Sequence, residues 1–221
     1  MYIPEHFRLC HDADALTFMR SNPFAILIST TSDGPYATHL PLFVRTEANE
    51  VRTEEGKVFL RGHVSKANPH WRYLEQQPQC MTIFHGPHSY ISPTNYIARE
   101  SVPTWNYAAV HVYGNARLFT SPQELHQMLD ELMGSFEPAY REQWDGLSST
   151  FRDNMLRQIV GFEIGATKIE GKFKLSQNRP RQDQANVITS LGKSDDSAVS
   201  GVSRMMKDQG LGRVTPDKHG E

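Results

Sequence analysis

The sequence predicts a mainly β fold of the α+β class: a closed or split antiparallel β-barrel with peripheral helices. Three observations carry this prediction. Short apolar or alternating runs recur along the chain, and turn-forming Pro, Gly, Asn and Ser residues separate many of them. Most of these runs lie close enough in sequence to pair as hairpins. A few helical patterns are inserted among them, and the sequence contains no internal repeat.

The composition is that of an ordinary globular protein of 221 residues, 38% hydrophobic and 22% charged. The net charge of −2 argues against binding to nucleic acid through bulk positive charge, but it does not exclude binding through a local basic patch. No apolar run approaches the roughly 18 residues of a membrane span. The N-terminus lacks the order of a signal peptide, and Cys10 and Cys80 form no CxxC motif. We therefore expect a cytoplasmic protein without membrane association.

The first strands are predicted between residues 24 and 63. Residues 24–31 form a β-rich apolar run followed by Ser-Asp-Gly-Pro, which is typical of a buried strand and a turn. Residues 36–45 read as the hairpin partner, and Pro41 favours an edge position or a bulge there. A charged, exposed loop is expected over 46–56, before a third strand over 57–63.

A short helix is predicted over residues 69–76, because Asn68 suits the cap and Pro69 suits the first helical position. Two strand candidates follow, over 79–85 and 88–92, on either side of a Gly-Pro turn.

Residues 107–119 alternate in character and predict a strand. One face holds Val110, Val112, Gly114, Ala116 and Leu118, and the other holds His111, Tyr113, Asn115 and Arg117. The clearest helix begins at the capping box Ser121-Pro-Gln-Glu124 and has apolar residues at a spacing of three and four. A second helix is expected over 148–158.

A strand pair over 159–168 and 171–176 is predicted around a Glu-Gly turn. The barrel domain is expected to cover residues 1–192. Residues 193–221 are then a C-terminal tail, with a short helix around 197–207 and a frayed end.

Five segments concentrate cationic, hydroxyl and aromatic side chains near predicted strand ends: 36–41, 62–69, 86–93, 104–107 and 171–179. Lys, Arg, Ser and Thr can hold a phosphate, and Trp or Tyr can cover a flat ring. Together the segments indicate an anionic ligand with an aromatic ring.

The last of these segments favours a phosphate or polyanion site. Lys172 and Lys174 alternate onto one strand face, and Arg179 and Arg181 follow with no acidic residue before Asp183. An ordinary solvated face is the alternative.

Several other functions are disfavoured. The sequence has no Rossmann or P-loop fingerprint and no GxSxG nucleophile elbow. A zinc site is disfavoured because His85-x-x-His88 has no partner cysteines. A ligand role and a backbone-bonding role are equally open for His39 and His63. Trp71 is expected to be a core residue, whereas Trp105, in a Pro-rich segment, favours a pocket or an interface.

At these same segments the chain resembles the PaiB family of FMN-binding negative transcriptional regulators. The resemblance runs from Met1 to Ile188. It rests on the opening Tyr-x-Pro-x-His-Phe and on residues 36–41, 62–71, 86–93, 102–111 and 161–179. It implies an FMN-binding split β-barrel related to pyridoxamine phosphate oxidase, usually a homodimer with FMN at the subunit interface.

The resemblance also implies a set of flavin-binding residues on the strands and on the loops that follow them. They are Thr38, His39, Leu40, His63, Ser65, Lys66, Asn68, Tyr90, Ser92, Trp105, Asn106, Lys174, Ser176, Gln177 and Arg179. The chain departs from the family pattern at Asn95-Tyr96, where Trp-Tyr is expected, and this bears on one wall of the pocket.

Three functions follow. The resemblance favours an FMN-binding negative transcriptional regulator that acts as a homodimer, through a protein partner or directly on DNA. The local basic patch for DNA would be Lys172, Lys174, Arg179 and Arg181, residues that overlap those expected to hold the FMN phosphate. The alternative is a small FMN-dependent oxidoreductase that uses NAD(P)H or a related reductant, so it is open whether the chain is an enzyme. The third is a haem-binding split barrel, for which ten histidines offer axial ligands.

Overall fold

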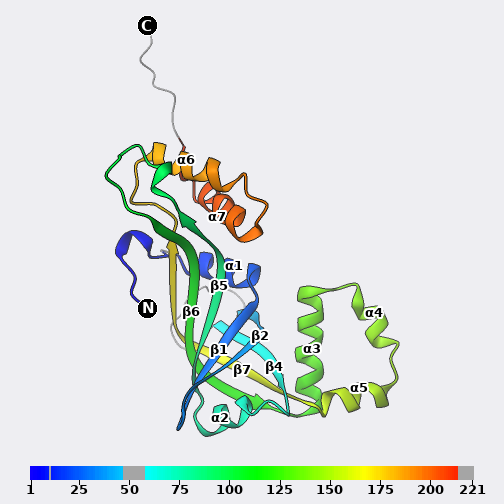
Figure 1. Ribbon diagram of the computed structural model, residues 1–221. Coiled ribbons are helices and arrows are strands. Elements are labelled where there is room, and N and C mark those ends of the chain that lie inside the picture. The colour runs from blue at the N-terminus through cyan, green and yellow to red at the C-terminus, as the bar shows by residue number, and fades with distance from the viewer. Residues whose placement is uncertain (10, 47–57, 214–221) are drawn as a thin grey trace. The chain divides into compact units, whose positions relative to one another are not determined.

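The computed structural model describes residues 1–9, 11–46 and 58–213. Within them, seven strands form one antiparallel sheet in the order β2-β1-β5-β6-β7-β4-β3 (Figure 1). The strands are β1 (Phe24–Thr31), β2 (Gly34–Pro41), β3 (Phe43–Thr46), β4 (Val58–Ser65), β5 (Gln79–Ile91), β6 (Thr104–Phe119) and β7 (Ile159–Lys174). The predicted α+β class with a sheet of antiparallel strands is confirmed. Most of the loop expected over 46–56 lies outside the described residues, as does Cys10.

Helices occur before, between and after the strands. They are the 3-10 helices η1 (Glu5–Phe7) and η2 (Pro93–Asn95) and the α-helices α1 (Asp12–Ser21), α2 (His70–Gln76), α3 (Pro122–Phe136), α4 (Tyr140–Asp145), α5 (Ser149–Leu156), α6 (Arg181–Leu191) and α7 (Ser197–Asp208). Helix α3 contacts α4 and α5, and α6 contacts α7. No helix of the described residues has the length and apolar character that crossing a membrane requires.

The chain divides into two compact units. The described part of unit 1 covers residues 1–9, 85–109 and 171–213, and that of unit 2 covers 11–46, 58–84 and 110–170. Strands β5, β6 and β7 each have residues in both units. The boundary expected between residues 192 and 193 therefore falls inside unit 1.

Helix α7 forms where the sequence predicts a short helix, but its packing is not that of a tail. Val202 and Met206 are fully buried, and the Ser203 hydroxyl donates to the carbonyl of Ile188 on α6 at 2.8 Å. Asp196 caps the helix by accepting hydrogen bonds from the N–H groups of Ala198 and Val199. Residues up to 213 are thus part of the fold of unit 1, and the frayed end expected beyond them lies outside the described residues.

The first hairpin, in unit 2, forms as predicted, but its second strand ends at Pro41 instead of at residue 45, and Phe43–Thr46 form the separate strand β3, which pairs with β4. Strands β1 and β2 pair from Phe24 opposite Pro41 to Thr31 opposite Gly34. Gly34 has φ 115°, which the turn requires and which other residues rarely adopt. Strand β2 lies at one end of the strand order, so Pro41 sits on an edge, where a missing N–H is tolerated.

Two predicted turns are wrong, because β5 and β7 run without interruption. β5 passes through Gly86 and Pro87, and its register with β1 extends only from Cys80 to Ile83. Pro87 therefore lies beyond the stretch where β1 needs N–H groups from β5. In β7, Gly171 allows a close approach: a Cβ there would lie 2.7 Å from the Leu9 side chain, and the Leu9 N–H donates to its carbonyl at 3.1 Å.

Helix α3 begins with the predicted capping box. The Glu124 N–H donates to the Ser121 hydroxyl at 3.3 Å, and that hydroxyl donates to the Glu124 carboxylate at 2.8 Å. Its apolar face packs on the sheet and on α5 through a buried cluster: Phe43, Phe119, Leu125, Met128 and Leu156. Burial of this face holds α3 in unit 2.

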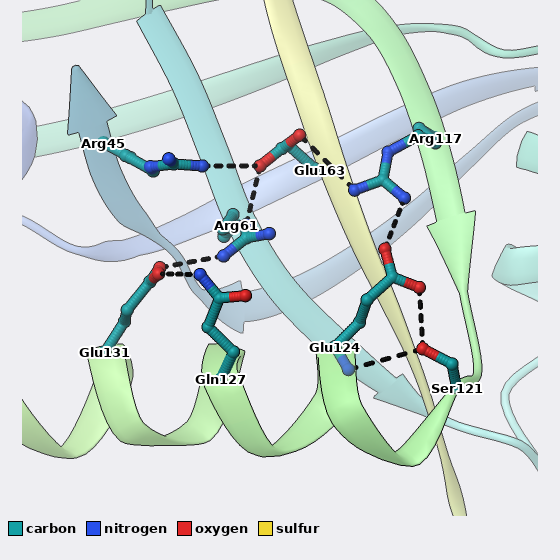
Figure 2. A network of polar contacts seen from close by, with 8 residues as sticks. All are labelled: Arg45, Arg61, Arg117, Ser121, Glu124, Gln127, Glu131 and Glu163. Carbon is teal, nitrogen blue, oxygen red and sulfur yellow. Dashed lines mark hydrogen bonds and ion pairs between the residues drawn. The ribbon is translucent and has the colours of Figure 1, made fainter. Parts of the chain in front are cut away.

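A charged network also joins α3 to the sheet (Figure 2). Arg61 on β4 is only 4% exposed, and its Nε lies 2.6 Å from Oε2 of Glu163 on β7. Its Nη1 donates to Glu131 on α3 at 2.9 Å. Arg45 and Arg117 approach Glu163 at 3.7 and 3.6 Å from opposite sides. The buried guanidinium thus has two carboxylates as partners.

Candidate functional site

The residues expected to bind FMN fall into both compact units. Unit 2 holds Thr38, His39, Leu40, His63, Ser65, Lys66 and Asn68. Unit 1 holds Tyr90, Ser92, Trp105, Asn106, Lys174, Ser176, Gln177 and Arg179.

In unit 2, a buried histidine joins two of the expected residues. The imidazole of His70 is 0% exposed. Its Nδ1 lies 2.7 Å from the Thr38 hydroxyl, and its Nε2 lies 3.0 Å from the Ser29 hydroxyl. The Asn68 amide donates to the same Thr38 hydroxyl at 3.2 Å and accepts a hydrogen bond from the Tyr36 hydroxyl at 3.4 Å. Thr38 and Asn68 are therefore held in place by His70, a residue that no sequence pattern singled out.

Burial lowers the pKa of His70 from 6.5 to about 4. The ring is therefore neutral at pH 7, with one nitrogen donating and the other accepting. Because the folded pKa lies below the unfolded value, the neutral ring adds stability above about pH 6.5, and this stability is lost as the pH falls toward 4.

We expect this titration to be visible in unfolding experiments. Between pH 7 and pH 5 the His70 contribution should lower the free energy of unfolding by about 2 kcal/mol. The measurement is urea unfolding of the wild type and of His70→Gln at both pH values. The variant should be less stable at pH 7 and should lose less stability on acidification. An equal loss in both proteins would show that His70 does not titrate in this way.

The other expected residues on β2 and β4 differ in accessibility. His39 is exposed beside the exposed ring of Phe24, with the ring centroids 6.3 Å apart, whereas the Leu40 side chain is buried. His63 is half-buried, and its Nδ1 has no hydrogen-bond partner among the described residues. Burial also lowers the pKa of His63. A cavity of about 380 Å³ is lined by His63, Ser65, Leu129, Trp144, Met155, Leu156, Gln158 and Ile159.

The loop between β4 and α2 has a fixed shape and exposed polar side chains. The Asn68 N–H donates to the Ser65 carbonyl at 2.9 Å, and the Lys66 N–H donates to the Gln158 carbonyl at 2.8 Å. The indole of Trp71 donates to the Lys66 carbonyl at 3.1 Å. The expectation that Trp71 is a core residue is thus wrong, because its ring is half-buried and braces this loop.

In unit 1, three expected residues hold a turn together. Asn106 is fully buried, and its amide donates to the Ser176 hydroxyl at 2.9 Å. Ser176 has φ 65°, an unusual backbone conformation for a serine. Gln177 accepts a hydrogen bond from the Leu175 N–H at 2.7 Å, and Gln184 donates to the Arg179 carbonyl at 2.8 Å. Asn106, Ser176 and Gln177 therefore fix the backbone that positions Arg179, and their contact with FMN stays a prediction.

Two lysines of β7 lie among carbonyl groups and aromatic rings. Lys172 is 8% exposed, donates to the Tyr2 carbonyl at 3.1 Å, and has its ammonium 5.3 Å from the centre of the Tyr107 ring. The Lys174 ammonium contacts the Thr104 hydroxyl and donates to the Trp105 carbonyl at 2.8 Å. Burial lowers the pKa of Lys174, and the nearby charges of Lys172 and Arg179 lower it further.

Arg179 completes the basic group, by which we mean Lys172, Lys174 and Arg179. Its guanidinium lies 4.1 Å from the centre of the Tyr96 ring. No ion pair joins any of the three cations to a carboxylate of the described residues. Arg181, at the start of α6, is exposed. Lys172 is thus buried, Lys174 and Arg179 are half-buried, and the three cations have no carboxylate partner among the described residues.

Aromatic side chains on β5 and β6 form an exposed face in unit 1. Trp105 is 53% exposed and Tyr90 is 49% exposed, with ring centroids 6.1 Å apart. The His88 ring stacks at 6.3 Å from that of Trp105, and His85 lies 4.9 Å from His88. No group of three metal-ligating side chains exists among the described residues. Ser92 uses its hydroxyl to accept the Thr94 N–H at the start of η2.

Residues 1–168 match the model of the family described as "Putative FMN-binding domain". The chain is 35% identical over 212 residues to protease synthase and sporulation protein PAI 2 of Bacillus subtilis, covering 95% of this chain and 98% of that protein.

Two solved structures share the fold. The flavocytochrome Anf3 of Azotobacter vinelandii has a TM-score of 0.58 at 14% identity, covering 78% of this chain and 72% of its own. The FAD and heme binding protein of Mycobacterium smegmatis has a TM-score of 0.58 at 13% identity, covering 76% and 73%. At such identities the likeness concerns the fold alone, and it agrees with the predicted split barrel. The match over residues 1–168 and the identity to PAI 2 place the chain in the family of FMN-binding domains of the PaiB type, for which FMN is the cofactor.

Proposed function

We propose that the chain is an FMN-binding regulatory protein of the PaiB type that acts as a homodimer. One observation carries the proposal: 35% identity over 95% of the chain to a protein named for protease synthase and sporulation. Similarity over nearly the full length of both chains supports a common role better than a shared domain would.

The loop between β4 and α2 has the groups that the FMN phosphate requires. Phosphate oxygens accept hydrogen bonds from hydroxyl, amide and ammonium groups, and Ser65, Asn68 and Lys66 offer one of each. Lys66 is exposed and has no ion pair with a carboxylate of the described residues. The loop also lies within the matched residues 1–168.

Other residues of unit 2 suit the remainder of the cofactor. The Nδ1 of His63, which has no hydrogen-bond partner among the described residues, can hydrogen-bond a polar edge of the flavin, and the His70 network keeps the Thr38 hydroxyl in a fixed position. Bound FMN would supply the capacity to take up and release electrons, while these residues bind and orient it.

The binding step is tested by absorbance titration of the purified protein with FMN. Lys66→Gln should weaken FMN binding by about tenfold or more, since a charge-assisted hydrogen bond to phosphate is lost. Lys193→Gln, an exposed lysine of unit 1, is the matched control and should leave binding unchanged. Absence of flavin binding by the wild type, or equal binding by Lys66→Gln, would contradict the assignment.

The regulatory role and the homodimeric state are tested by separate measurements on the FMN-loaded protein. Analytical ultracentrifugation should give twice the chain mass. Binding to DNA or to a regulatory protein partner would support the proposal, and direct DNA binding should weaken with salt. If the protein consumed NAD(P)H steadily in the presence of an acceptor, and bound neither DNA nor a protein partner, the oxidoreductase function would be favoured over the regulatory one.

A further inference from the structure

We propose that a cavity between α3 and α4 of unit 2 binds a small organic amine, whose apolar body enters the cavity while its ammonium group meets the carboxylate of Glu137. None of the residues expected to bind FMN lines this cavity. The inference therefore goes beyond the proposed function and does not depend on it.

The first argument is the size and the apolar lining of the cavity. Its volume is about 260 Å³, and an apolar cavity of about 150 Å³ is already large enough for benzene. Leu129, Leu132 and Met133 of α3 form an aliphatic part of the lining. Ligand sites are typically apolar in this way, with a small number of polar groups that fix the orientation of the ligand. A compound somewhat larger than benzene, with a single polar group, therefore suits the cavity.

The second argument is the charge of Glu137, which supplies a carboxylate to this lining. Glu137 is exposed and is the C-cap residue of α3. The helix dipole is negative at this end, so it disfavours a carboxylate and favours a cation. The last turn of α3, Met-Gly-Ser-Phe, contains no basic residue that could compensate. A ligand ammonium would supply the missing positive charge.

The surrounding charges leave this carboxylate available. Helices α3 and α4, with the turn between them, contain six acidic residues, and Arg141 is their single lysine or arginine. Glu124 and Glu131 contact arginines of the sheet, and two further carboxylates share Arg141. Glu137 and Glu142 have no ion pair with a cation of the described residues. The excess charge near the cavity is therefore negative, which favours a cationic ligand over an anionic one.

The third argument is the set of aromatic rings that shares the cavity with Glu137. Phe136, Tyr140 and Trp144 line it, with Trp144 buried and Phe136 46% exposed. The faces of aromatic rings attract cations, and proteins use such rings to bind organic ammonium groups. An inorganic cation would leave the apolar lining uncovered, whereas an amine with an apolar body covers it and meets the carboxylate.

The test is isothermal titration calorimetry of the FMN-loaded protein in low salt with phenethylamine, 2-phenylethanol and ethylamine. Phenethylamine should bind with a Kd of about 1 mM or tighter. The alcohol has the same ring without the charge and should bind about fivefold more weakly, the range of an exposed ion pair. Ethylamine has the charge without the ring and should show no measurable binding.

Two variants assign the charge effect to one residue. Glu137→Gln should weaken the binding of phenethylamine about fivefold and leave that of 2-phenylethanol unchanged, a difference that misfolding would not produce. Glu142→Gln is the matched control, because Glu142 is an exposed residue of α4 that does not line the cavity. It should change the binding of phenethylamine far less. Equal effects of the two variants, or equal binding of the amine and the alcohol, would overturn the proposal.

Flavin absorbance and sedimentation of the same samples separate the other outcomes. Leu129 and Trp144 also line the cavity beside His63 and Ser65, so release of FMN by phenethylamine would mean that the amine enters that cavity, and the proposal would be overturned. It would also be overturned if none of the three compounds bound, or if Phe136→Ala converted a dimer to a monomer, because a second copy would then cover this face. If phenethylamine bound as expected to a protein that takes up no FMN, the amine site would stand and the proposed function would fail.

Discussion

Replacing Glu163 by Gln is expected to lower the free energy of unfolding by about 3 kcal/mol, the range found when one partner of a buried ion pair is removed. Glu163 is 13% exposed and lies between three guanidinium groups, of which Arg61 is the most buried. Gln keeps the shape of the side chain and removes its charge. Arg61 would retain Glu131 alone, so a nearly buried cation would lose its closer partner.

Urea unfolding of the wild type and the variant at pH 7 measures this loss. Glu124→Gln is the matched control, because Glu124 pairs with the same Arg117 but at the exposed end of the network (Figure 2). Exposed ion pairs contribute little, so the control should lose far less stability. If both variants lost the same amount, burial of the Arg61–Glu163 pair between β4 and β7 would not be what makes this network stabilising.

Elements with local signals were predictable from the sequence. The apolar run of β1, the capping box at Ser121 and the helix at 197–207 all appear where expected, because their signals lie within one or two turns of the chain. The turns expected at Gly86-Pro87 and Glu170-Gly171 failed for the opposite reason. Gly171 faces Leu9, which is distant in sequence, and no local pattern distinguishes such a close approach from a turn.

Helices α1, α4 and α6 were not predicted. Their boundaries carry weaker signals: none of the three has a side-chain hydrogen bond at its N-cap. Tertiary packing determines them instead, as shown by buried Trp144 in α4 and Val187 in α6.

The same distinction between local sequence signals and tertiary packing applies to the candidate site. Residue types around Ser65–Asn68 and Lys172–Arg179 indicated an anionic ligand, and binding of such a ligand at these residues stays a prediction. His70 was missed because nothing near it in sequence reveals that Thr38 and Ser29 approach its two nitrogens. The sequence also could not show that Ser176 is buried and that the Gln177 side chain bonds the backbone of the turn, because both depend on tertiary contacts.

Gly114→Ala is the second large effect that we expect, a loss of about 3 kcal/mol in the free energy of unfolding, at the upper end for an overpacked core. A Cβ at this position would lie 2.4 Å from the backbone carbonyl oxygen of Gly165 and 2.7 Å from the Ile164 side chain. Gly114 is in β6 and Gly165 in the adjacent β7, so neither backbone can move without disturbing the sheet.

The substitution Gly134→Ala is the control that separates this steric clash from the general effect of replacing glycine by alanine. Gly134 lies inside α3, and a Cβ there meets nothing within 4 Å. Alanine restricts the unfolded chain and favours the helix, so Gly134→Ala should raise stability by about 0.5–1 kcal/mol. Thermal and urea unfolding of the two variants should therefore give changes of opposite sign. A neutral Gly114→Ala would mean that β6 and β7 can separate locally at no cost, and the close approach of their backbones at this position would then not be needed for the sheet.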